Sequence, residues 1–198
     1  MEKFEGKPST QEIIKQYENQ LRVFNEKLES FDSPLGHGTT SEHLKSILET
    51  GLGGVVPENS YAQSISLTDL EKPDGLLGAY AFARMNTQDL EFIGEDVVTR
   101  YSELNSLVDV VSLKAQFQKY KDLRNPTGFP VVCVFEGKDV KFEYMNPRIP
   151  SEVELKLGES PLKPKILLVP NKKVNEIKKI AEDSGVTCEV LPIEILEV

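Results

Sequence analysis

The chain is organised around one stretch, Leu35-Gly36-His37-Gly38-Thr39-Thr40-Ser41-Glu42. It places His37, one of two histidines in the sequence, between two glycines and directly before the helical pattern of residues 43–48. Glycine lets a backbone approach a ligand closely and adopt positive φ. Thr39 followed by Glu42 matches a capping box, which predicts that a helix begins just after the histidine. The structural alternative is an ordinary turn that enters a helix.

The composition is that of an ordinary globular domain. The chain has 198 residues, of which 39% are hydrophobic and 28% charged, and this length suffices to bury a core. The net charge of −9 argues against a nucleic-acid partner, because such binding surfaces are basic. No apolar run reaches the roughly 20 residues that cross a bilayer, and the N-terminus does not match a signal peptide. We therefore expect no membrane association and a cytoplasmic location, in its own or a host cell.

Few residues could bind a metal ion or form a disulfide. Cys133 and Cys188 both lie in apolar, strand-like runs, which is typical of buried free thiols in a reducing compartment. The histidines are His37 and His43. These four side chains do not form a zinc ligand pattern, so no metal is expected.

The clearest predicted helix covers residues 9–31. Its apolar residues recur at spacings of three and four, which indicates one buried stripe. We expect residues 1–31 to form an amphipathic helix packed on a domain of residues 32–198. The alternative is that the stripe binds a partner or a second copy of the chain. Its residues are Ile14, Tyr17, Leu21, Phe24, Leu28 and Phe31.

Further helices and strands follow from periodicity. Helices are expected at 43–50, 76–84 and 172–183, with a helical insertion at about 87–125. Strands are expected at 64–68, 129–135, 140–144, 151–157, 166–169 and 187–191. Gly137-Lys138-Asp139 predicts a hairpin turn, and Gly51 and Gly185 are placed to end helices. A helical first half followed by mostly consecutive strands predicts the α+β class.

Three features could carry chemistry. The first is His37 in its glycine setting, and the second is Tyr80 on a helix of small residues. The third is the pair Glu152 and Glu154, which share one face of a strand because alternate residues point the same way. The structural alternatives are a core position for Tyr80 and a solvated face for the two glutamates.

Taken in this order, the segments resemble the ADP-ribosyltransferase superfamily. The similarity is to its His-Tyr-Glu branch, which includes the poly-ADP-ribose polymerases and the diphtheria-toxin type. It spans about residues 35–170. The most specific part, 36–52, is similar to the His-Gly-Thr segment and the helix ending in Gly-Leu that follows it. The other parts are Ile65-Ser66-Leu67-Thr68, Ala79-Tyr80-Ala81 and Ser151-Glu152-Val153-Glu154-Leu155.

The resemblance implies two packed, mostly antiparallel sheets around an NAD cleft. It implies an enzyme that uses NAD as a substrate, without a metal, cleaves the nicotinamide–ribose bond and transfers ADP-ribose to an acceptor. His37 would hold the nicotinamide ribose, the Gly38 backbone would pair with the carboxamide, and Tyr80 would stack on the nicotinamide ring. Glu152 would be the catalytic glutamate, with Glu154 as the alternative. Thr39 and Ser66 would complete the NAD contacts.

The sequence departs from the family pattern at two positions. The family's central tyrosine falls near Ser66, and Gly36 stands where an aromatic or aliphatic residue is usual. Two alternatives therefore stay open: a degenerate module that binds NAD or ADP-ribose without transfer, and an enzyme similar to RNA 2′-phosphotransferases. The branch that uses Arg, Ser and Glu is excluded, because histidine occupies position 37.

The acceptor is not specified by the sequence. The acceptor loop of the family precedes the glutamate strand, here at 144–150, so Tyr144, Arg148 and Glu154 are the acceptor-side candidates. The acidic composition favours a protein acceptor over nucleic acid. Mono- or poly-ADP-ribosylation, plain NAD hydrolysis, the oligomeric state, and a housekeeping, toxin or effector role all stay open.

Overall fold

The computed structural model describes residues 10–53, 64–72, 75–85, 128–138, 142–144, 152–156 and 161–192. The insertion expected at about 87–125 and Arg148 lie outside these residues. The described elements, in chain order, are α1 Thr10–Leu28, β1 Pro34–Thr40, α2 Ser41–Thr50, β2 Ser64–Asp69, α3 Gly75–Met85, β3 Pro130–Glu136, β4 Phe142–Tyr144, β5 Glu152–Lys156, β6 Ile166–Val169, the 3-10 turn η1 Asn171–Lys173, α7 Val174–Asp183 and β7 Glu189–Pro192.

The described strands belong to one sheet with the order β4-β5-β2-β1-β3-β6-β7. The pairings are antiparallel except for that of β6 with β7, which is parallel. Strand β1, from the beginning of the chain, lies in the middle of the sheet. The described part of the chain therefore has the α+β architecture that the sequence predicted.

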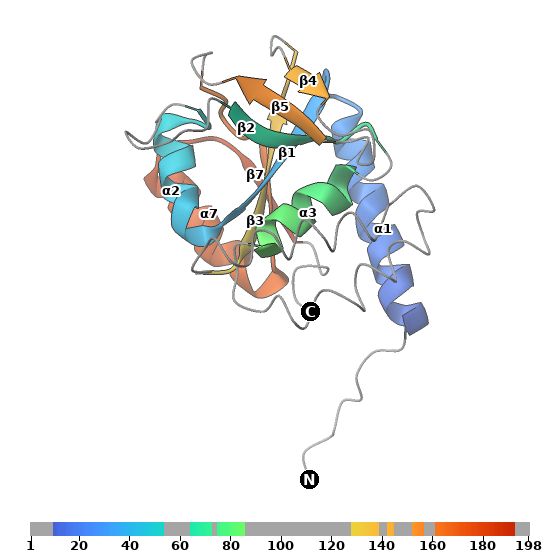
Figure 1. Cartoon of the computed structure of the whole chain (residues 1–198). Helices are drawn as coiled ribbons and strands as arrows, with labels where there is room; N and C mark the ends of the chain where they lie inside the picture. The colour runs from blue at the N-terminus through green and yellow to red at the C-terminus, as the bar shows by residue number, and fades with distance from the viewer. Residues whose placement is uncertain are drawn as a thin grey trace.

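The sheet has two halves that meet at a narrow junction. Strands β1 and β3 pair along seven residues, from Pro34 opposite Glu136 to Thr40 opposite Pro130. By contrast, β1 and β2 pair only through Leu35 opposite Asp69 and Gly36 opposite Thr68. Beyond this junction the halves diverge, and β2, β5 and β4 run across the direction of β1 and β3 (Figure 1). Instead of the two packed sheets expected from sequence, the described strands form one hydrogen-bonded sheet with a sharp change of direction.

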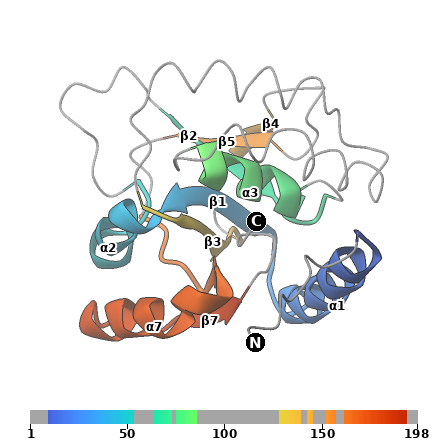
Figure 2. The same ribbon diagram turned by 90° about the horizontal axis from the view of Figure 1, so that it is seen from below.

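Helices cover both faces of this sheet. Helices α2 and α7 share a core with residues of β1, β3 and β6, and α3 packs on the opposite face, where Ala79 lies against Gly36. Figure 2 shows α3 on one side of β1 and β3 and α7 on the other. The shared core on the α2 and α7 side includes Leu35, Leu44, Leu48, Cys133, Phe135, Leu167 and Ile177.

The His37 segment is a strand, which corrects both the capping box expected at Thr39 and Glu42 and the alternative of an ordinary turn. Pairing with β3 keeps the backbone extended through Thr40, so α2 begins at Ser41. The N-cap residue is Thr40 and not Thr39, and within the described residues its side chain makes no capping hydrogen bond. Neither Gly36 nor Gly38 adopts positive φ. A long-range ladder has therefore overridden a local helix-start signal.

The expected hairpin between residues 129–135 and 140–144 is also wrong. Strand β3 lies between β1 and β6, whereas β4 pairs with β5 at the far edge of the sheet. The physical reason is burial: every residue of β3 except Glu136 is buried. A strand buried in this way needs a hydrogen-bonding neighbour on each edge.

Both glycine helix ends predicted from sequence are confirmed. Gly51 has φ +84° and its N–H donates to the Ile47 carbonyl at 2.9 Å. Gly185 has φ +66° and follows α7. Residues with a Cβ rarely adopt such angles, so these glycines end α2 and α7 for a conformational reason.

Helix α1 lies on the side of the molecule away from α2 and α7 (Figures 1 and 2). Phe24 and Leu28 of its apolar stripe are buried. The Lys27 Nζ lies 2.5 Å from Glu189 Oε1 and links α1 to β7. The side chains of Ile14 and Tyr17 lie outside those that the structure describes. No helix among the described residues is long and apolar enough to span a membrane.

Candidate functional site

The junction brings together segments that are far apart in the sequence. Gly36 of β1 is opposite Thr68 of β2, and Thr68 is opposite Glu152 of β5. Neighbouring strands are about 4.8 Å apart, so the Cα atoms of Gly36 and Glu152 are about 10 Å apart. The glycine–histidine strand and the glutamate strand therefore meet through β2.

Helix α3 packs directly over this row of residues. A Cβ added at Gly36 would lie 2.8 Å from Thr68 Oγ1 and 3.0 Å from Ala79 Cβ. The Thr68 hydroxyl donates to the Gly36 carbonyl at 3.3 Å. Gly36 is therefore needed for a close approach of helix to strand. Tyr80, which follows Ala79 in α3, is buried.

The ladder directs the backbone of Gly38 away from β3. The Ser33 carbonyl accepts from Gly137 N–H, and Ser41 N–H donates to the Phe129 carbonyl. Because hydrogen bonding alternates along an antiparallel strand, the odd-numbered residues of β1 pair with β3, and Gly36 and Gly38 point their N–H and C=O groups to the other edge.

On that edge, the register with the described part of β2 ends at Gly36. Gly38 is buried, and β2 does not pair with its N–H and C=O groups at the point where the two halves of the sheet separate. A planar carboxamide has the complementary pair of groups.

His37 reaches this region from the opposite face. It is half-buried and lies opposite Cys133, whose side chain belongs to the core shared with α2 and α7. Thr39, which is buried, occupies the same face two residues later. His37 thus lies on the face of β1 opposite to the one covered by α3, the helix that carries Tyr80.

The two candidate glutamates occupy different levels of the sheet. Glu152 is opposite Thr68, whereas Glu154 is opposite Ser66 on one side and Glu143 on the other. If the β1–β2 ladder continued past Gly36, Ser66 would be level with Gly38. Glu154 therefore lies at the level of Gly38, and Glu152 lies at the level of Gly36. The side chains of Ser66, Glu152 and Glu154 are outside those described.

Tyr144, predicted on the acceptor side, lies in β4 opposite Val153. Val153 belongs to the core on the α2 and α7 side. Opposed residues share a face, so the position of Tyr144 is on the other face of the sheet from that of Glu152. The register thus separates Tyr144 from Glu154, which the sequence grouped with it on the acceptor side.

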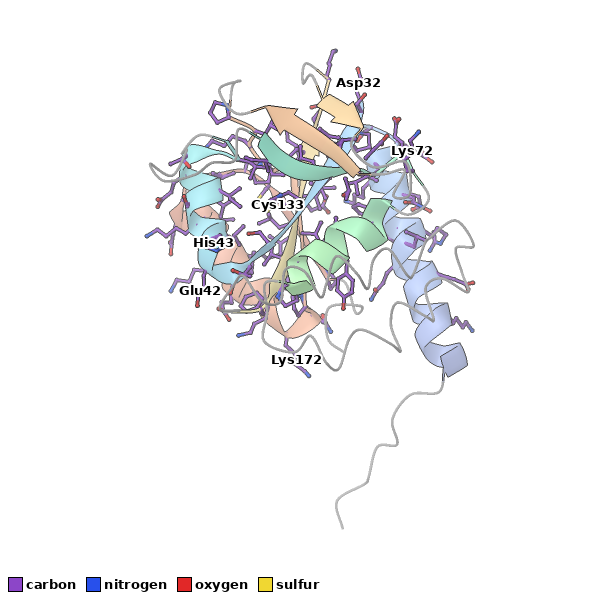
Figure 3. The ribbon with its side chains drawn as sticks, viewed as in Figure 1. Asp32, Glu42, His43, Lys72, Cys133 and Lys172 are labelled. Carbon is purple, nitrogen blue, oxygen red and sulfur yellow. The ribbon has the colours of Figure 1, made fainter. Side chains whose placement is uncertain are left out.

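The thiol opposite His37 is held in its neutral form. Burial raises the pKa of Cys133, and Cys188 raises it further. Figure 3 shows Cys133 at the centre of the molecule. Burial also raises the pKa of Cys188. Because the thiolate is the reactive form, this burial lowers the reactivity of both thiols.

Sequence reasoning missed two residues of the junction, Thr68 and Ala79. Thr68 is fully buried and bonds to the Gly36 carbonyl, and Ala79 permits the close helix approach. The alternation in residues 64–68 was the available signal for Thr68, because it places residues 64, 66 and 68 on one face. No local signal could identify Ala79, since its role depends on the partner strand.

Over the described ranges, no group of three or more His, Cys, Asp or Glu side chains could hold a metal ion. No protein-family model matches the chain, and no curated protein matches it at a significant level of similarity.

Proposed function

We propose that the chain is an NAD-dependent ADP-ribosyltransferase whose NAD site lies where β1 and β2 separate. In this proposal, the β4–β5–β2 half and the β1–β3–β6–β7 half are the two sheets of the ADP-ribosyltransferase fold. The observation that carries the proposal is the backbone of Gly38, which points to the edge of β1 just beyond the last β1–β2 pair. The donor and acceptor of Gly38 fit the carboxamide of nicotinamide.

The surroundings of Gly38 suit a flat aromatic ligand. Helix α3 packs against Gly36 and carries Tyr80, whose ring offers an apolar face to nicotinamide. The glutamates are on β5, which is separated from β1 by β2. A carboxylate there would orient the ribose and stabilise the positive charge that develops on it.

The reaction is a glycosyl transfer. The bond between the ribose C1′ and the nicotinamide nitrogen breaks, and its electron pair neutralises the cationic pyridinium nitrogen. The resulting oxocarbenium-like carbon then bonds to a nucleophilic atom of the acceptor, which loses its proton. With water as the acceptor, the products are nicotinamide, ADP-ribose and a proton.

A second candidate is a module that binds NAD without transferring ADP-ribose. Two observations favour it: Ser66 stands where the resembled family has tyrosine, and the register places His37 on the face of β1 away from α3. In this case Gly38 and Tyr80 would bind nicotinamide, while the ribose would lack the contacts that promote cleavage.

Two measurements on the full chain separate these candidates. Calorimetry measures NAD binding, and chromatography measures nicotinamide release over hours. We expect binding with slow release in wild type, and His37→Ala should reduce the release. Binding without any release would favour the binding module, and absence of binding would refute both candidates.

The glutamates are tested by Glu152→Gln and Glu154→Gln. Loss of the catalytic carboxylate should lower nicotinamide release by about 10²–10³-fold. The sequence resemblance predicts that Glu152 is this carboxylate. The strand register instead favours Glu154, because Glu154 is at the same position along the sheet as Gly38. Glu136→Gln is the matched control, because Glu136 is an exposed residue at the end of β3. Equal release in all three variants would contradict a role for either glutamate.

The acceptor is tested separately, with protein preferred over nucleic acid. Tyr144→Ala and Arg148→Ala should alter which proteins are modified while NAD hydrolysis continues. Loss of hydrolysis in either variant would show that the residue serves the NAD site instead. Labelled NAD incubated with a lysate, followed by gel separation, gives the readout.

A further inference from the structure

Thr40 carries a buried hydroxyl without a hydrogen-bond partner in the structure. It is the last residue of β1, only 1% exposed, and its Oγ1 is the one buried side-chain oxygen or nitrogen left unpaired among the described residues. The buried hydroxyl of Thr68 shows the contrast, since it donates to the Gly36 carbonyl. Buried hydroxyls are nearly always paired in folded proteins, so an unpaired hydroxyl at this place calls for an explanation.

The position of Thr40 is next to the proposed NAD site. Along β1, Thr40 is two residues beyond Gly38 and on the same face, at a distance of about 7 Å. Both residues follow the last pair between β1 and the described part of β2. A ligand that pairs with Gly38 and runs along this edge would therefore reach Thr40.

Thr40 is also the N-cap residue of α2. This helix has ten residues, and within the described chain the Thr40 side chain does not cap it. Backbone N–H groups in the first turn, together with the helix dipole, favour an anion at this end. Ser41 N–H is already satisfied by the Phe129 carbonyl, which fixes the first turn against β3.

One lysine and one glutamate lie near this end of α2. The Lys173 Nζ lies 4.9 Å from the centre of the Phe129 ring, and Phe129 N–H donates to Ser41 Oγ at 3.2 Å. Lys173 also pairs with Glu176 at 2.8 Å. Figure 3 shows Glu42 and His43 near the start of α2 and Lys172 at the lower end of the molecule. Lys173 brings positive charge to the Phe129 side of this helix start, while Glu42 is exposed in the first helical turn.

We propose that the Thr40 hydroxyl donates a hydrogen bond to a phosphate oxygen of the bound dinucleotide, at the N-terminus of α2. The inference rests on the proposed NAD site and adds the phosphate subsite to it. Gly38 then binds the nicotinamide end, and Thr40 fixes the phosphate that follows the ribose.

The test compares Thr40→Val with Thr40→Ser and with Thr50→Val as the matched control. Thr50 lies at the other end of α2, where its hydroxyl donates to the Ser46 carbonyl at 2.7 Å. Calorimetry with NAD, nicotinamide mononucleotide and nicotinamide riboside gives the affinities. The riboside lacks the phosphate, so it separates a phosphate contact from a ribose contact.

We expect Thr40→Val to weaken NAD and mononucleotide binding by about tenfold or more, as for a hydrogen bond to a charged group. Riboside binding should be unchanged. Thr40→Ser and Thr50→Val should bind NAD like wild type. Thr40→Val should melt no lower than wild type, because it removes an unpaired buried hydroxyl.

Three outcomes would overturn the inference. Wild-type affinity for NAD in Thr40→Val refutes the phosphate contact and leaves the proposed function intact. Equal weakening of riboside and mononucleotide assigns the hydroxyl to the ribose. Wild-type protein that binds none of the three ligands refutes the proposed function, and the phosphate subsite with it.

Discussion

Strand β1 pairs very differently with its two neighbours. With β3 it pairs along seven residues, and the facing residues are buried except for His37 and Glu136; with β2 it pairs through two residues and then separates. The first contact uses nearly all the hydrogen-bonding capacity of the facing edges. In the second contact, β2 does not pair with the edge of β1 beyond Gly36. We infer that the β3 side holds β1 rigid, so that its other edge can serve a ligand.

Mutations in the long β1–β3 contact should lower the free energy of unfolding more than mutations at the short β1–β2 contact. Phe135 is fully buried and lies opposite Leu35, so Phe135→Ala should lower the free energy of unfolding by about 3–5 kcal/mol. Urea denaturation gives the value. Val23→Ala on the exposed face of α1 is the control and should change it by less than about 0.5 kcal/mol. Equal losses in the two variants would mean that β3 is not the support of the sheet.

The junction should be sensitive to added volume. Gly36→Ala places a Cβ within 3.0 Å of Thr68 Oγ1, Leu70 Cδ2 and Ala79 Cβ, and should cost about 1–3 kcal/mol of stability. Combining it with Ala79→Gly should recover part of this loss. A double-mutant cycle should give a coupling of at least about 0.5 kcal/mol. Simple additivity would show that α3 does not press on Gly36.

The thiol behind His37 should make stability depend on alkaline pH. Burial raises the pKa of Cys133 above its ordinary value of 9.0. The unfolded chain then loses the thiol proton above that pH while the folded chain keeps it, so the stability from this group is present below pH 9 and lost as the pH rises. The free energy of unfolding then falls by up to about 1.4 kcal/mol per pH unit. Urea denaturation at several pH values should show a shallower decline in Cys133→Ala. Identical slopes would contradict the burial of the thiol.

The smallest loss of stability is expected for a mutation at the C-terminal end of α2, far from the junction. The Lys163 Nζ donates to the Leu48 and Glu49 carbonyls at 2.6 and 2.7 Å. Lys163→Met should therefore cost about 1 kcal/mol, because it removes a cation from a helix C-terminus. Exposed Lys165 provides the control, and Lys165→Met should leave the melting temperature unchanged. A Lys163→Met variant as stable as this control would show that the carbonyls need no cation.

The sequence predicted much of the local structure. It identified β3, β5 and β6 and the ends of α2 and α7, because alternation, burial patterns and glycine conformations are properties of short segments. It also singled out the four segments that meet at the junction. Two local signals misled: Thr39 and Glu42 indicated a helix start, and Gly137 indicated a hairpin. In both cases pairing with β1 or β6 outweighed the local preference.

What the sequence by itself determined is the α+β class and the residue types of the candidate site, His37, Gly38, Tyr80 and the two glutamates. Only the tertiary structure decided how they are placed. The strand order puts Thr68 between Gly36 and Glu152, and the register sets His37 on the face away from Tyr80 and Glu154 at the level of Gly38. The physical reason is that strand order and register depend on hydrogen bonds between distant segments. A shift of one residue would reverse every face without changing the local pattern.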